Sequence, residues 1–272
     1  MRSLLAAIAG LAVITTVTSS APAVLLGSDS FDYPAGAIAG QNGGTGAAGA
    51  YTGAGNVTTP GLAYPNFQSS GNKFTTGVPP NDSGAFRPIP SINTDAGTFF
   101  VGFLASVPGA IPNYGGISFF TAATPGQTGG TEELFLGKPS GTDTYGFDVS
   151  GVDGDNTVGT GFSNVTASAT PSLLVYRITF TPAGDTIDSY INPTPGQPLP
   201  ATPSGTFAIP EASFPDTVNN LRFQSGTQAI NFDELRIGTT FADVAPVPEP
   251  GTAGLLAAGA LGLLARRRRC GN

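Results

Sequence analysis

Residues 173–191 read LLVYRITF, TPAGD and TIDSYI in succession, and this stretch decides the fold class. In the last run, Ile187 and Ile191 share one parity. Asp188 and Tyr190 take the other parity. A period of two places alternate side chains on opposite faces of a β-strand, and the glycine in TPAGD is typical of a tight turn. The stretch therefore predicts a β-hairpin.

Short apolar runs separated by Gly, Pro, Asn and Asp continue on both sides of the hairpin, and long stretches of helical period are missing between the two ends of the chain. Such a pattern indicates strands and turns. The clearest further runs are residues 98–107, 117–122, 133–137, 145–149, 207–209, 221–224 and 230–237. Short strands in this number predict an all-β sandwich or barrel. Residues 41–55 are nearly all small or polar, which predicts a long loop.

The residues that the chain lacks exclude several kinds of chemistry. The sequence has no histidine and a single cysteine, Cys270. Catalysis by a Ser-His-Asp or Cys-His arrangement and His-ligated zinc are therefore excluded. Between residues 24 and 245, six basic residues stand against 17 acidic ones, a net charge of −11. This acidic balance argues against nucleic acid and anionic lipid as partners, and it is compatible with cations and neutral glycans.

The amino end has the pattern of a secretory signal peptide. Arg2 provides a short basic region, and residues 4–17 are mostly apolar. Ala21 and Ala23 flank Pro22 in the small-x-small pattern that signal peptidase cleaves. We therefore expect residues 1–23 to be removed and the mature chain to begin at Val24 on the far side of the membrane.

The carboxyl end has three parts in a fixed order: an extended Pro-Glu-Pro stretch, the apolar residues 251–265 and a run of arginines. The residues outside the apolar part are Val247, Pro248, Glu249, Pro250, Arg266, Arg267, Arg268 and Arg269. Positive charge holds such an end on the cytoplasmic side of a membrane. Fifteen apolar residues at about 1.5 Å each reach about 22 Å, less than the ~30 Å hydrocarbon core, so this transmembrane helix suits a transient anchor. A buried core helix is the alternative.

This order of parts resembles the PEP-CTERM sorting signal of Gram-negative bacteria that make extracellular polymer. In that family a membrane transpeptidase, exosortase, recognises and processes the tail. The resemblance implies exosortase and signal peptidase as partners. It also implies a protein at the cell envelope, the outer surface or the extracellular matrix, with the sorting signal in residues 246–272.

Residues 24–245 between the two signals are expected to form one domain. Residues 30–36 (SFDYPAG), 40–46 (GQNGGTG) and 230–238 (INFDELRIG) resemble parts of PEP-CTERM proteins with concanavalin A-like or laminin-G-like ectodomains. The resemblance implies an all-β, two-sheet jelly-roll sandwich between a signal helix and a transmembrane helix. Because the first and last strands of that fold lie close together, Phe31 and Phe232 are expected in one core region. A tryptophan common in that group is missing here, since the chain has none.

Paired carboxylates would indicate a carbohydrate-active enzyme, because glycoside hydrolases use two of them at a set separation. The Glu-x-Asp-x-x-Glu spacing that some enzymes of this fold carry is missing. Glu132–Glu133 and Asp233–Glu234 are adjacent pairs, which regular strands would split across opposite faces. We interpret them as solvated or rim carboxylates, with a structural role for Asp233, which accepts bonds from a neighbouring loop, as the alternative. The protein is therefore expected not to be an enzyme, with a glycoside hydrolase-like activity as the rival.

Two further sets of residues remain as candidate ligand sites. Asp153, Asp155 and Asn156 gather oxygen atoms in one Asp-Gly turn, where a weak structural Ca²⁺ is the alternative to an ordinary turn, and no other cofactor is expected. Tyr33 and Tyr51 are candidate rings for stacking on a sugar. The expected function is a non-catalytic structural or adhesive one that includes weak binding of extracellular polysaccharide.

Overall fold

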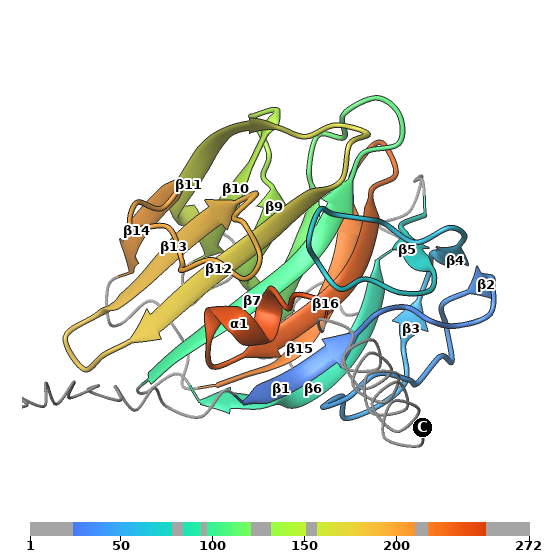
Figure 1. Ribbon diagram of the computed structural model, residues 1–272, viewed down its shortest axis with the longest axis horizontal. Coiled ribbons are helices and arrows are strands. Elements are labelled where there is room, and N and C mark those ends of the chain that lie inside the picture. Colours follow the sequence, from blue (N-terminus) through green and yellow to red (C-terminus); the bar gives the residue numbers. More distant parts are fainter. Residues whose placement is uncertain are drawn as a thin grey trace, which may run out of the picture.

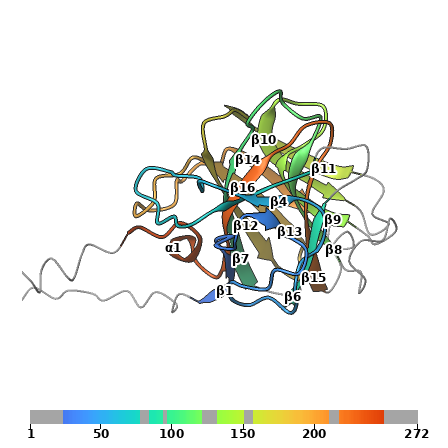
Figure 2. The same ribbon diagram turned by 90° about the vertical axis from the view of Figure 1, so that its right-hand side faces the viewer.

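The computed structural model describes residues 24–77, 84–93, 97–120, 132–150, 157–209 and 217–248. Within these residues the chain forms 16 strands and one short helix. The strands make two antiparallel sheets, one of nine strands and one of seven (Figure 1). Seen from the side, the sheets are stacked layers with α1 (Phe241–Val244) outside the nine-stranded one (Figure 2). The two-sheet form of the predicted all-β fold is therefore confirmed.

The nine-stranded sheet contains the predicted hairpin and the last strand of the domain. In spatial order its strands are β14 (Gly205–Ile209), β13 (Asp185–Ile191), β12 (Ser172–Phe180), β7 (Gly97–Ser106), β16 (Asn231–Gly238), β5 (Lys73–Thr75), β4 (Asn56–Thr58) and β2 (Gly36–Ala37). The first strand, β1 (Leu25–Asp29), pairs antiparallel with β16. The first and last strands thus lie side by side, as the resemblance implied.

The seven-stranded sheet covers one face of the first. In spatial order its strands are β11 (Thr157–Thr166), β10 (Thr144–Ser150), β9 (Glu132–Lys138), β8 (Gly115–Phe120), β15 (Thr217–Ser225), β6 (Ala85–Asn93) and β3 (Thr52–Gly53). Every pairing in it is antiparallel. Neighbours along the chain are neighbours in space from β8 to β11, so short connections suffice there.

The hairpin of β12 and β13 has the register that the alternation predicts. Leu174 faces Ile191 and Ile178 faces Ile187 on the side that packs between the sheets. β12 is apolar at nearly every position because both of its faces are buried. The face away from the main core is covered by a second apolar cluster that includes Val175. A strand that is buried on both faces loses the polar half of the usual alternation.

Aromatic rings from both sheets meet in the main core. Phe31, just after β1, stacks on Phe74 with 5.7 Å between ring centroids. Phe232 of β16 lies 6.4 Å from the same ring. Phe223 of β15 contacts Phe31 at 5.4 Å and Phe232 at 5.1 Å, which ties the two sheets together. The prediction that Phe31 and Phe232 share one core region is confirmed.

A smaller apolar cluster lies on the outer face of the nine-stranded sheet. Leu104 of β7 and Leu173 of β12 are fully buried there. They are covered by Leu62 and Phe67 from a loop and by Val244 of α1. Thr240 caps this one-turn helix through a capping box with Asp243. The outer face of the nine-stranded sheet is therefore covered by a loop and a short helix, and the local sequence did not predict that they pack there.

Two long strands escaped the sequence interpretation, each for a physical reason. β6 contains Pro88 and Pro90, which usually argue against a strand because proline has no N–H to donate. β6 tolerates them because β3 pairs only with the first two residues of β6. The rest of that edge of β6 therefore has no strand partner. β11 contains Gly159 and Gly161, where a Cβ would collide with the rings of Phe207 and Phe147.

The carboxyl end of the domain packs against the sandwich up to Ala245. Val244 and Ala245 are buried, and Val247 is 41% exposed. No helix within the described ranges is long and apolar enough to span a bilayer. The predicted signal peptide with Ala21 and Ala23, the apolar residues 251–265 and the sorting residues Glu249, Pro250, Arg266, Arg267, Arg268 and Arg269 lie outside the described residues.

Candidate functional site

A polar pocket of about 240 Å³ lies on the outer face of the seven-stranded sheet. Alternation along the strands explains its chemistry. Leu221 and Phe223 of β15 point into the core, whereas Arg222 and Gln224 between and beside them line the pocket. Its complete lining is Tyr114, Glu132, Phe135, Ser140, Asp148, Arg222 and Gln224.

Hydrogen bonds hold the polar side chains of the pocket in fixed positions. The amide nitrogen of Gln224 donates to Ser118 Oγ at 2.5 Å and to Glu132 Oε2 at 2.9 Å. Arg222 donates to the side-chain oxygen of Gln224 and lies 3.6 Å from the Glu132 carboxylate. Donors and acceptors are thus presented side by side on one face of the sheet.

Aromatic rings surround these polar groups. The Arg222 guanidinium lies over Phe120 at 5.2 Å from the ring centroid and over Phe86 at 5.5 Å. Tyr114 packs edge-on against Phe135, with 6.4 Å between centroids and 78° between ring planes. Tyr114 is half-buried and lines the pocket. In such an arrangement the rings provide an apolar contact, and the planar polar groups beside them provide hydrogen bonds to the same ligand.

Asp148 is the titratable group of the pocket with the clearest perturbation. Burial raises the pKa of Asp148 to about 6, and the negative charge of Glu132 adds to this rise. Both causes act against the ionised form. Asp148 therefore changes its charge in the range between pH 5 and pH 7, where an ordinary aspartate would stay ionised.

The two tyrosines predicted to stack on a sugar lie elsewhere, in the protein interior. Tyr33 is 8% exposed and Tyr51 is 1% exposed. Their hydroxyls donate to Asp29 Oδ2 at 2.7 Å and 3.0 Å. The prediction that these rings bind a glycan by stacking is wrong for this structure, because a buried ring has no face to offer.

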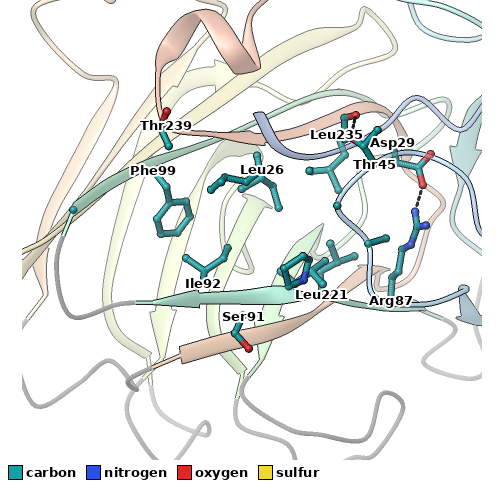
Figure 3. A pocket seen from close by; sticks show the side chains of 18 of the residues that line it. Leu26, Asp29, Thr45, Arg87, Ser91, Ile92, Phe99, Leu221, Leu235 and Thr239 are labelled. Atoms are coloured by element: carbon teal, nitrogen blue, oxygen red, sulfur yellow. Dashed lines mark hydrogen bonds and ion pairs between the residues drawn. The ribbon is translucent and has the colours of Figure 1, made fainter. Parts of the chain in front are cut away.

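Asp29 is the centre of a buried polar network at the end of β1. It forms an ion pair with Arg87 of β6, and both side chains are 4% exposed (Figure 3). Arg87 also donates to the carbonyl of Gly49 at 3.1 Å and to that of Gly43. Burial raises the pKa of Asp29, while the hydrogen bond from Tyr33 and the charge of Arg87 oppose this rise. The network fastens the predicted long loop to the sandwich.

The adjacent carboxylates Asp233 and Glu234 are buried at 0% and 2% exposure, so their interpretation as solvated groups is wrong. The expected split across opposite faces also fails, because Glu234 has a φ of 51° and the register shifts at this point. Asp233 Oδ2 accepts from the backbone N–H of Leu62 at 2.7 Å, and Glu234 Oε1 accepts from that of Ser70 at 2.7 Å. The alternative, a structural role in which Asp233 accepts a bond from a neighbouring loop, is confirmed.

The other predicted sites have mixed outcomes. Glu133 is buried at 1% exposure, which corrects its interpretation as a solvated carboxylate, whereas Glu132 is half-buried at the pocket. Asp153, Asp155 and Asn156 lie outside the described residues. Among the residues that the structure describes, no group of three or more His, Cys, Asp or Glu side chains is placed to hold a metal ion.

Sequence reasoning missed Arg222 and Gln224 as site residues. Residues 221–224 read LRFQ, and their alternation already placed the two polar side chains on one face of a strand. That signal could have indicated a polar sheet face. It could not indicate that Glu132 and Asp148, from strands distant in sequence, lie beside them.

Comparison with known proteins addresses the carboxyl end. Residues 246–269 match the PEP-CTERM protein-sorting motif. This chain carries a PEP-CTERM sorting signal. The motif begins directly after the last buried residues of the sandwich, and of its described residues Pro246 is half-buried whereas Val247 and Pro248 are exposed. No curated protein matches the chain.

The solved structures similar to this chain include lectins of low sequence identity. Peanut lectin with a 9mer peptide is 13% identical, with a TM-score of 0.46, over 81% of this chain and 98% of the lectin. Lectin II from Ulex europaeus is 11% identical, with a TM-score of 0.44, over 70% of this chain and 92% of the lectin. The exoplasmic/lumenal domain of VIP36 is 8% identical, with a TM-score of 0.43, over 72% and 85%.

Proposed function

We propose that this PEP-CTERM protein is exported, processed by an exosortase and retained at the cell envelope or in the extracellular matrix. There its sandwich binds a neutral glycan without catalysis. The observation that carries the glycan proposal is the polar pocket on the outer face of the seven-stranded sheet. The Glu132 carboxylate, the Gln224 amide and the Arg222 guanidinium are held by one another in it, and Asp148 and the half-buried Tyr114 complete its lining.

The chemistry of the pocket favours a neutral ligand. Glu132 and Asp148 offer acceptors for sugar hydroxyls, and Arg222 is the one basic group in the lining. An anionic glycan would meet two carboxylates against one guanidinium, within a domain of net charge −11. A neutral hexose polymer avoids that repulsion and can place a ring on Tyr114.

The proposal is tested by measuring binding of the full-length chain to an array of neutral and acidic glycans at pH 7.5. We expect signals on neutral glycans of extracellular-polymer type. Binding to none of them would contradict the glycan proposal. Release of new reducing ends from a bound glycan would instead contradict the proposed absence of catalysis.

Glycan affinity is expected to fall as the pH is lowered through 6. Asp148, with its raised pKa of about 6, is ionised above this pH and neutral below it, so its charge-assisted hydrogen bond to a sugar hydroxyl is present at pH 7.5 and lost at pH 5. One such bond corresponds to about tenfold in affinity. Titration of the best array ligand at both pH values measures the change.

Asp148→Asn should bind about tenfold more weakly at pH 7.5 and lose the pH dependence. The matched control is Asp32→Asn, because Asp32 is exposed and does not line the pocket. It should keep both the affinity and the pH dependence. An unchanged pH profile in Asp148→Asn would exclude this aspartate as the sensing group.

The sorting proposal makes a separate expectation about the mature protein. Intact-mass measurement of surface material should find a chain that lacks residues 1–23 and the arginine run. A variant with residues 266–269 all changed to Gln should keep its tail, because positive charge no longer fixes the orientation of the apolar segment. A native surface protein that still ends at Asn272 would contradict processing by an exosortase.

A further inference from the structure

A second cavity, of about 450 Å³, lies between the two sheets and is lined mainly by apolar side chains. One wall comes from β1, β7, β12 and β16, and the other from β6 and β15 (Figure 3). The apolar lining includes Leu26, Ile92, Phe99, Phe180, Leu221 and Ile237. The polar pocket described above is on the outer side of the seven-stranded sheet, so the two are separate sites.

The size and chemistry of this cavity are those of a ligand site. Protein interiors are close-packed, with few voids larger than a water molecule. An apolar cavity of ~150 Å³ already stays dry and takes up benzene, and small-molecule sites usually measure about 300–1,000 Å³. The volume of about 450 Å³ falls within that range. The cavity opens to solvent beside Leu26, which is 40% exposed, and its apolar walls offer few polar partners to the water that a ligand would displace.

One end of the cavity is polar, yet its charges are already satisfied. Asp29 Oδ2 accepts from Tyr51 and from Arg87, and Asp29 Oδ1 accepts from the backbone N–H of Phe31 at 2.8 Å. The Arg87 guanidinium is also bonded to the carbonyls of Gly43 and Gly49. A charged ligand group at this end would have to replace these buried bonds. Apart from this satisfied pair the lining contains no charged side chain, so a charged group elsewhere on the ligand would find no countercharge in the cavity. An uncharged ligand fits both ends.

The opposite end offers hydroxyl groups. Asp29 and Arg87 lie at one end of the lining, whereas Phe99 and Thr239 lie at the other (Figure 3). The hydroxyl of Thr239 at that end accepts from the backbone N–H of Val24 at 3.1 Å, which leaves its own proton to donate. An elongated apolar molecule with a neutral polar tip can thus bury its chain between the sheets and direct its tip towards a hydroxyl.

From these observations we propose that the cavity between the sheets binds a neutral, elongated apolar molecule of the long-chain alcohol class. The cavity is independent of the glycan pocket, so each site can fail its own test without the other. Binding buries apolar surface and pairs no charges, so screening by salt does not weaken it.

The probe is the neutral fluorophore N-phenyl-1-naphthylamine, added to the full-length chain, and the competitors are dodecanol, dodecanoate and dodecyltrimethylammonium. We expect saturable probe binding that dodecanol displaces at least tenfold better than either charged competitor. Equal displacement by all three would overturn the inference of a neutral ligand. No saturable binding would overturn the site itself.

Ile92→Trp tests the location, because it fills the cavity from β6 in a chain that contains no other tryptophan. Leu26→Trp narrows the cavity from β1, where Leu26 is 40% exposed and a larger side chain is tolerated. The matched control is Val158→Trp, since Val158 is 37% exposed and outside the lining. All three variants keep identical terminal apolar stretches, so probe binding to those stretches cancels in the comparison.

Both cavity variants should bind the probe at least tenfold more weakly than Val158→Trp, and the indole of Ile92→Trp should emit at shorter wavelength than that of the control. Thermal melting of each variant shows whether the sandwich is intact. If either cavity variant melts like the control and binds the probe equally well, the assignment to this cavity is wrong. If Ile92→Trp fails to fold, Leu26→Trp decides the outcome.

Discussion

Asp29→Asn should lower the free energy of unfolding by about 3–5 kcal/mol, which corresponds to a fall in Tm of roughly 6–20 °C. The substitution leaves the Arg87 guanidinium, 4% exposed, without its countercharge. It also places an amide nitrogen or a single amide oxygen where Tyr33, Tyr51 and Arg87 all donate. An uncompensated buried charge is among the most destabilising defects that a single substitution produces.

The matched control is the same Asp-to-Asn change at the second close ion pair. Asp188 binds Arg177 at 2.6 Å, but the Arg177 side chain is 37% exposed and can be hydrated when the pair is broken. Asp188→Asn should therefore cost about 1 kcal/mol or less. Urea unfolding followed by far-ultraviolet circular dichroism measures both. Equal losses in the two variants would show that burial is not what makes the Asp29 pair important.

Phe223→Ala should also cost about 3–5 kcal/mol, because it removes the ring at which the aromatic clusters of the two sheets meet. Phe223 is fully buried. Its ring centroid lies 5.1 Å from that of Phe232, 5.4 Å from that of Phe31 and 5.5 Å from that of Phe74. Neighbouring strands hold these partners in place, so the space left by the ring cannot close fully.

Phe162→Ala is the control for this prediction, since Phe162 of β11 is 44% exposed. It should change the free energy of unfolding by no more than about 0.5 kcal/mol. Denaturant midpoints and slopes distinguish a loss of stability from a change in the surface exposed on unfolding. A loss below about 1 kcal/mol for Phe223→Ala would mean that the core relaxes around the missing ring.

Elements with strong local signals could be predicted from the sequence. β12 and β13 were predictable because two apolar runs flank a five-residue turn, and their register follows from a period of two. β6 was not predictable, because the effect of Pro88 and Pro90 depends on whether a strand lies on their side. The sorting signal was predictable because its order along the chain is itself the signal.

Site residues divide in the same way. The alternation in residues 221–224 was sufficient to place Arg222 and Gln224 on one face. Nothing in the sequence around Tyr33 and Tyr51 distinguishes them from surface tyrosines. Only their contacts with Asp29 show that they are internal. A bulge at Glu234, which turns both carboxylates of its pair towards one loop, likewise has no local sequence mark.

The sequence by itself determined the all-β class, the hairpin, the absence of histidine and cysteine chemistry in residues 24–245, and the carboxyl-terminal sorting signal. These features depend on composition, on a period of two or on linear order, all of which a chain displays before it folds. Only the tertiary structure decided that Asp29 pairs with Arg87, that Glu132 and Asp148 share a pocket, and that a cavity remains between the sheets. Each of these depends on contacts between strands far apart in the chain, and such contacts are set by packing.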